Sequence, residues 1–86
     1  MLSKIDKIIK LILEKPIRKD ITLDEYLRIM KFLGFEKVRH TGSHMIFLNK
    51  ENEKTLVGVS HDKHMKASYI KELREYIIKY REDLLT

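Results

Sequence analysis

The stretch Arg39-His40-Thr41-Gly42-Ser43-His44-Met45-Ile46-Phe47 decides the fold that the sequence predicts. Gly42-Ser43 is a turn pair, because glycine supplies the backbone freedom of a tight connection and serine is common in turns. We therefore expect a hairpin of two strands, at about 35–41 and 44–49. His44 opens the second strand, beside the turn.

Alternation along the first strand predicts a basic face. Successive strand side chains point to opposite sides of a sheet. Lys37, Arg39 and Thr41 are therefore expected to point one way, and Val38 and His40 the other. The second strand begins with an uninterrupted apolar run, which is typical of a central or covered strand.

Helical spacing surrounds this hairpin. Isoleucines at 5, 8, 9 and 12 predict an amphipathic helix that starts with a Ser3/Asp6 capping box and runs to about Lys15. Thr22 and Glu25 form a second capping box, and Gly34 stands at the expected C′ position. The apolar face of this second helix is expected to hold Leu23, Tyr26, Leu27, Met30 and Leu33.

A third strand and a closing helix complete the predicted fold. The strand is expected at 54–60, where Gly58 could mark a bulge or the close approach of another backbone. The helix should start at Ser68, which can act as its N-cap, and should fade near Asp83. The resulting fold class is α+β, a two-layer sandwich with a three-stranded antiparallel sheet.

Length and composition predict one small domain. The 86 residues leave room for a single core, so we expect one domain over 1–86, with 1–15 as an additional N-terminal helix. Cysteine is absent, which excludes disulfides and thiolate metal sites. The N-terminal stretch has neither a signal-peptide core nor the length to span a bilayer, so a cytoplasmic protein without a membrane partner is expected.

Positive charge and histidine gather in the strand region. The net charge is +5, and residues 37–71 hold seven basic side chains against three acidic ones. All four histidines, His40, His44, His61 and His64, lie in the same region. This pattern favours RNA as the partner, with Lys37, Arg39 and Lys66 as phosphate contacts. The alternative is a solvated face whose charge serves solubility.

The ordered motifs resemble the HicA-type toxins, small ribonucleases that cleave messenger RNA. The resemblance rests on Leu33-Gly34-Phe35, Arg39, Gly42-Ser43-His44 and Phe47, followed by Val59-Ser60-His61, Lys66 and the helix from Ser68. It implies the α-β-β-β-α order of double-stranded-RNA-binding domains.

The resemblance also implies an activity and a partner. His44 would be the catalytic histidine of a metal-independent endoribonuclease, since imidazole can take and give a proton near neutral pH. Lys37, Arg39, Ser43, His61 and Lys66 would bind RNA, without a cofactor or small-molecule ligand. A HicB-like antitoxin would neutralise the protein.

Three other interpretations stay open from the residues. A metal site could use His40 and His44, or His61 and His64, although four residues of continuous strand span roughly 13 Å. A non-catalytic RNA-binding module needs only phosphate and 2′-hydroxyl contacts. A protein-interaction domain would use the apolar first helix, which could also be read as a membrane-surface element.

Overall fold

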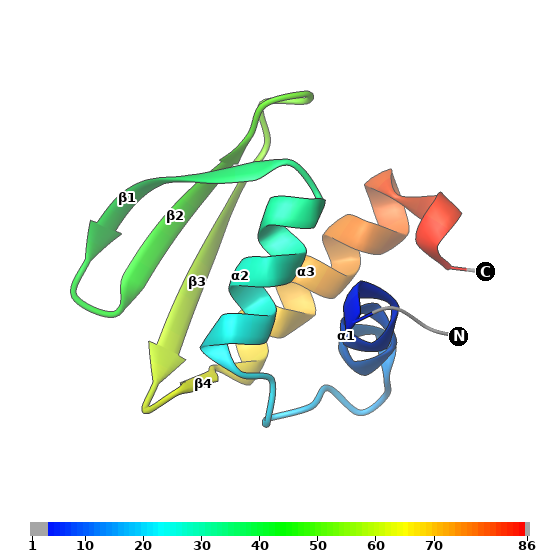
Figure 1. Ribbon diagram of the computed structural model, residues 1–86, viewed down its shortest axis with the longest axis horizontal. Coiled ribbons are helices and arrows are strands. Elements are labelled where there is room, and N and C mark those ends of the chain that lie inside the picture. Colours follow the sequence, from blue (N-terminus) through cyan, green and yellow to red (C-terminus); the bar gives the residue numbers. More distant parts are fainter. Residues whose placement is uncertain (1–3, 86) are drawn as a thin grey trace.

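The computed structural model describes residues 4–85 and combines three helices with a four-stranded antiparallel sheet. The elements, in chain order, are α1 (Lys4–Leu13), α2 (Leu23–Phe32), β1 (Phe35–Thr41), β2 (His44–Asn49), β3 (Thr55–His61), β4 (His64–Met65), α3 (Ala67–Tyr80) and a 3-10 helix, η1 (Glu82–Leu84). All three α-helices lie on one side of the sheet, and α1 packs on α2 and α3 away from the strands (Figure 1). The predicted α+β class is confirmed. Among residues 4–85, none of the helices has the length and apolar composition that crossing a bilayer requires.

The prediction of a three-stranded sheet was wrong. After β3 the chain turns back at Asp62, whose φ of 55° is a left-handed conformation that aspartate tolerates. His64 and Met65 then pair with the end of β3 as β4. Met65 N–H also donates to the Ile21 carbonyl at 2.8 Å, on the opposite side of β4. A strand of two residues is too short to produce a sequence pattern, so the segment resembled a polar loop.

Helix α2 begins and ends where the sequence predicts. Glu25 N–H donates to Thr22 Oγ1 at 3.1 Å, and Thr22 N–H donates to Glu25 Oε1 at 2.9 Å, which confirms the capping box. Gly34 follows the helix with a φ of +91°, the left-handed conformation that a C′ glycine supplies. The predicted apolar face was wrong at one position: Leu27 is 37% exposed, whereas Ile29 is fully buried.

The other two helices differ from the prediction at their ends. Helix α1 ends at Leu13, two residues early, and Ser3 of its predicted capping box lies outside the described residues. Helix α3 starts at Ala67, so Ser68 is not its N-cap. The N-cap is Lys66, which makes no side-chain capping hydrogen bond.

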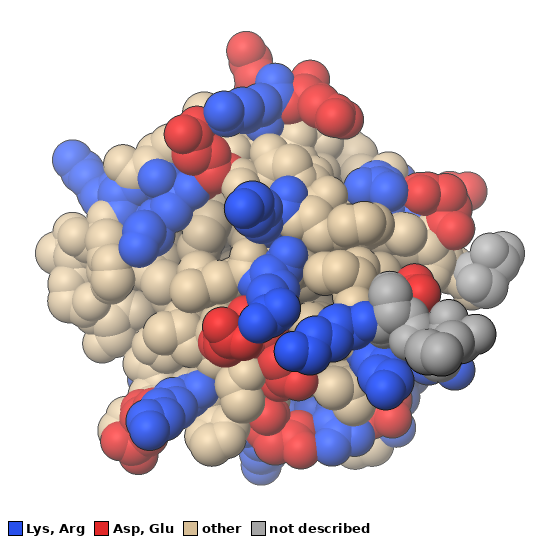
Figure 2. All heavy atoms as spheres, viewed as in Figure 1, with Lys and Arg blue, Asp and Glu red and all other residues tan. Residues whose placement is uncertain are grey.

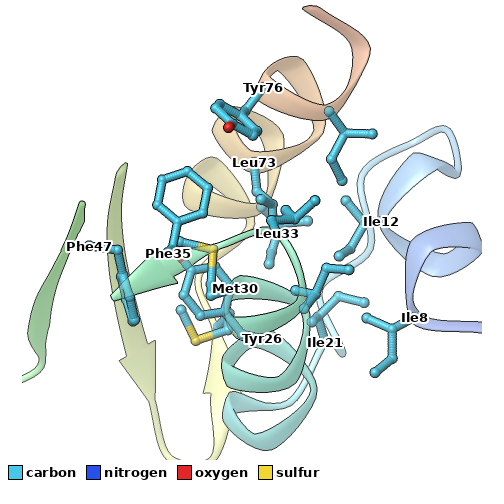
Figure 3. Close-up of a cluster of buried hydrophobic side chains, with 14 of the residues drawn as sticks. Ile8, Ile12, Ile21, Tyr26, Met30, Leu33, Phe35, Phe47, Leu73 and Tyr76 are labelled. Carbon is cyan, nitrogen blue, oxygen red and sulfur yellow. The ribbon is translucent and has the colours of Figure 1, made fainter. Parts of the chain in front are cut away.

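The core fills the space between the sheet, α2 and α3, and continues to α1 (Figure 3). Ile8, Ile9 and Ile12 of α1 are at most 5% exposed. Burying a large aliphatic side chain contributes about 1.5–3 kcal/mol, so these three residues hold α1 firmly on the domain. The isoleucine face of α1 is therefore buried on the domain, so the part of the helix that could have faced a membrane surface is covered.

Tyr26 packs against Gly58 where α2 meets the middle of the sheet. A Cβ at Gly58 would lie 2.8 Å from Tyr26 Cε2, so a side chain, and not another backbone, makes the close approach predicted there. The Tyr26 ring also meets Phe47 edge-on, with the ring centroids 5.6 Å apart. Within the described residues, Tyr26 Oη is buried without a hydrogen-bond partner. Burial, assisted by the charge of Glu72, raises the pKa of this hydroxyl above its usual value, so it stays neutral.

Asn49 organises the other end of the sheet. Its side chain is buried, and Nδ2 donates to the Leu33 carbonyl at 2.9 Å and to Tyr76 Oη at 3.1 Å. Its Oδ1 accepts the Glu51 N–H at 2.9 Å, which shapes the turn between β2 and β3. Asn52 Nδ2 donates to the same Tyr76 hydroxyl at 2.9 Å.

The two buried tyrosines should therefore respond in opposite ways to loss of the hydroxyl. Tyr26→Phe keeps the ring contacts and removes an unpaired polar group, so the free energy of unfolding should rise by about 1 kcal/mol. Tyr76→Phe leaves the Asn49 and Asn52 amides without their acceptor and should lower it by about 1–3 kcal/mol. Urea unfolding of the two variants beside the parent measures both changes, and equal effects would contradict this account of the core.

Candidate nucleic-acid interface

A β-bulge decides which β1 side chains share a face with His44. Lys37 stands opposite Phe47, but Arg39 stands opposite Ile46, so Val38 is an extra residue on β1. Cross-strand partners point to the same side of a sheet. Lys37 therefore shares the helix side with buried Phe47, whereas Arg39 lies on the side that no helix covers.

The predicted alternation along β1 was therefore wrong. Lys37 and Arg39 lie on opposite faces, because the extra residue reverses the pattern from Val38 onward. His40 falls on the helix side with Lys37, and Lys37 Nζ lies 3.3 Å from His40 Nδ1. We refer to the side of the sheet without helices as the open face.

His44 projects from the open face at the start of β2. It pairs with Thr41 on β1 and with Val59 on β3. The preceding turn contains Gly42 with a φ of +58°, and an added Cβ there would meet nothing within 4 Å. Glycine is therefore favoured at position 42 by the left-handed backbone conformation and not by a lack of space for a side chain. His44 and the neighbouring Ser43 are exposed, so a large ligand can reach both side chains.

Two further histidines reach the same end of the open face. His61 stands two residues beyond Val59 on β3, which places it on the same side, and it pairs directly with His64 of β4. Both side chains are exposed. Val59 lies between His44 and His61 and is only 4% exposed, although it is not part of the core cluster on the helix side.

A shallow depression of about 560 Å³ adjoins these histidines. Its lining includes Lys19, Asp20, His61, His64 and Lys66. The backbone of Lys66 donates to the Val59 carbonyl at 2.9 Å, which holds the start of α3 beside the open face.

The charged side chains around the depression differ in whether they already have an ion-pair partner. Arg18 donates to both Asp20 carboxylate oxygens, at 2.8 and 2.7 Å, and this hydrogen bonding lowers the pKa of the Asp20 carboxyl. Asp20 is therefore ionised and already paired. The first turn of α3 contains no acidic residue, so its backbone N–H groups and Lys66 favour an anion at this edge.

The structure brings most of the sequence-predicted site residues together, but not all. Arg39, Ser43, His44 and His61 lie on the open face or at its hairpin turn, and Lys66 lies at its edge. Lys37 does not join them, because the bulge turns it to the helix side.

The histidine pairs considered for a metal are separated differently. His40 and His44 lie on opposite faces and cannot share one ion, whereas His61 and His64 are direct cross-strand partners. Within residues 4–85, no group of three or more His, Cys, Asp or Glu side chains is placed to hold a metal ion.

Positive charge is not confined to the strands. In the view of Figure 2, Lys and Arg atoms also gather over the middle of the molecule, where α2 and α1 lie, and are interspersed with acidic atoms. The β1–β2 turn at the left of the same view is largely uncharged. In this view, basic and acidic atoms are mixed and form no continuous basic surface.

Sequence reasoning missed the contribution of the linker between α1 and α2. Lys19 and Asp20 line the depression, yet about forty residues separate them from His61. No local sequence pattern predicts a contact between residues so far apart in the sequence. The pairing of His64 with His61 had a weak signal, since Asp62-Lys63 between two histidines has the length of a hairpin turn.

The described residues form a small α+β domain with exposed histidines on a sheet face that none of the described helices covers. A family model described as HicA toxin of bacterial toxin-antitoxin matches residues 24–79 of the 86. The chain belongs to the HicA toxin family. The match begins at Asp24, within α2, so α1 lies outside it. Comparison with curated proteins and with solved structures gave no significant match.

Proposed function

We propose that the protein is a HicA-like toxin that cleaves messenger RNA through histidine acid-base catalysis at His44. The observation that carries this proposal is the position of His44, exposed on the open face within the segment that matches the HicA toxin family. A neutral imidazole can accept a proton from a ribose 2′-hydroxyl, which then attacks the adjacent phosphate. Action on messenger RNA would take place in the cytoplasm.

The order of elements supports RNA as the substrate. Within the matched segment, α2, the strands β1 to β3 and α3 follow in the order of double-stranded-RNA-binding domains, with the two-residue β4 added before α3. Such domains recognise RNA through phosphate and 2′-hydroxyl contacts. Arg39, Ser43, His61 and Lys66, which lie on or beside the open face, are the residues proposed to make contacts of this kind. Lys37 is left out of this proposal because it points to the helix side.

The open face also suits a neutralising protein partner. Ile46, Leu48 and Val57 are only half-buried there, and Val38 at the bulge is 54% exposed. Exposed apolar side chains beside a polar site are typical of protein-interaction surfaces. A HicB-like antitoxin that covered these residues would also cover His44, so binding and inhibition would be the same event.

Replacement of His44 tests the catalytic assignment. His44→Ala should slow cleavage of a long single-stranded RNA by at least about 100-fold, the contribution typical of a positioned acid or base. His40→Ala is the matched control, because His40 lies on the same hairpin but faces the helix side. Gel analysis in buffer containing a chelator measures cleavage without added metal.

Two outcomes would contradict the proposal. Equal cleavage by the parent and the His44→Ala variant would remove His44 from the mechanism. RNA binding without cleavage by the folded parent, weakening steeply with salt, would identify a non-catalytic binding module.

Arg39 and Lys37 provide a test of the open face as the RNA-binding surface. They are two residues apart on β1 and carry the same charge, but they face opposite sides. Arg39→Ala should reduce the slope of log affinity against log salt by about one, since one phosphate contact is lost. Lys37→Ala should change the slope by much less. Both substitutions would be made in the His44→Ala variant, so that the RNA is not cleaved, and RNA binding would be measured by filter binding at several salt concentrations. Equal slopes for the two substitutions would contradict the assignment of this face.

A further inference from the structure

His61 is a second exposed imidazole on the same face as His44. His44 pairs with Val59, and His61 follows Val59 by two residues on β3, so His44 and His61 are diagonal neighbours. Such neighbours on one face lie about 7–8 Å apart, with their Cβ atoms somewhat closer. Val59, buried between them, is apolar and cannot compete for a proton. His44 and His61 are thus both neighbours of Val59 on the open face.

The spacing suits the two sides of one phosphodiester. Displacement at phosphorus needs the attacking and leaving oxygens roughly in line. A group that takes a proton from the attacking oxygen and a group that gives one to the leaving oxygen must then stand on opposite sides of the phosphate. Each needs to come within hydrogen-bond reach, about 3 Å, of its oxygen. Two imidazoles at diagonal positions of one face are close enough together to stand on the two sides of one phosphate.

We propose that His61 is a second catalytic residue, the general acid that protonates the leaving 5′-oxygen while His44 acts as the general base. This inference rests on the proposed ribonuclease function. The bond from the 2′-oxygen to phosphorus forms, and the bond from phosphorus to the 5′-oxygen breaks. The 2′-hydroxyl proton passes to His44, and the His61 proton passes to the 5′-oxygen. The products are a 2′,3′-cyclic phosphate and a free 5′-hydroxyl, and both rings return to their starting states by exchange with water.

Distance to His44 selects His61 over His64 as the second imidazole. His61 Nε2 also lies 3.5 Å from Asp62 Oδ2. His64 pairs with His61 but belongs to β4, one strand farther from His44, or about 5 Å more. His61 is thus the nearer of the two to a phosphate held at His44.

A modified substrate distinguishes a role of His61 as general acid from a role in RNA binding alone. Sulfur in place of the 5′-bridging oxygen leaves as a thiolate and does not need a proton. We would place this sulfur at the position that the parent cuts first in a short oligoribonucleotide. His61→Ala should cleave the oxygen substrate at least about 100-fold more slowly than the parent and cleave the sulfur substrate at nearly the parental rate. His44→Ala should be slow on both.

Controls keep the test independent of folding. The His61 side chain is 80% exposed, so its truncation leaves the core intact, and circular dichroism checks this for each variant. His61→Gln, which retains a polar side chain but cannot donate a catalytic proton, should behave as His61→Ala does. His40→Ala, on the helix side, should match the parent on both substrates.

The remaining outcomes overturn the inference in distinguishable ways. If His61→Ala cleaves the oxygen substrate as fast as the parent while His44→Ala does not, the acid is not His61 and the proposed function stands. If His61→Ala is equally slow on both substrates, His61 binds RNA and does not donate the proton. If the folded parent cleaves neither substrate, the proposed function fails and this inference fails with it.

Discussion

The close contact between Tyr26 and Gly58 is the constraint on which the arrangement of this protein depends. Only glycine at position 58 lets the Tyr26 ring approach the middle of the sheet, since a Cβ would lie 2.8 Å from the ring. This contact, with the T-shaped packing on Phe47, fixes α2 against one face of β2 and β3. The Tyr26 hydroxyl, which has no hydrogen-bond partner among residues 4–85, lowers the stability of the arrangement, so packing of the ring must outweigh this cost. The opposite face is left without a helix.

Two backbone irregularities then determine which charged and titratable side chains lie on the open face. The bulge at Val38 removes Lys37 from that face and leaves Arg39 on it. The left-handed Asp62 turns the chain into β4 and sets His64 beside His61. Neither feature contributes much to the core. Each changes the side on which a charged or titratable group lies, because one residue more or less in a strand exchanges the two faces.

The sequence predicts elements whose signals are local. Thr22 with Glu25, Gly34, and the Gly42-Ser43 turn each act within a few residues, and the structure has α2 and the first hairpin at the expected positions. The bulge was missed because it is a property of two paired strands, and the sequence of β1 alone alternates without a break. The depression was missed because Lys19 meets His61 only after the chain has folded. The catalytic assignment of His44 depends on family resemblance, since an exposed histidine at a strand start has no distinctive local pattern.

A domain of this size has a physical reason to act at an open surface. With 86 residues, the hydrophobic core occupies most of the space between the helices and one face of the sheet, so little of the chain remains to enclose a substrate. A polymer such as RNA does not require enclosure, because its phosphates can be held from one side. The same openness leaves the proposed catalytic groups unprotected against a protein that docks on the sheet. A toxin built in this way would need no conformational switch for its control, since occupation of one face would be sufficient.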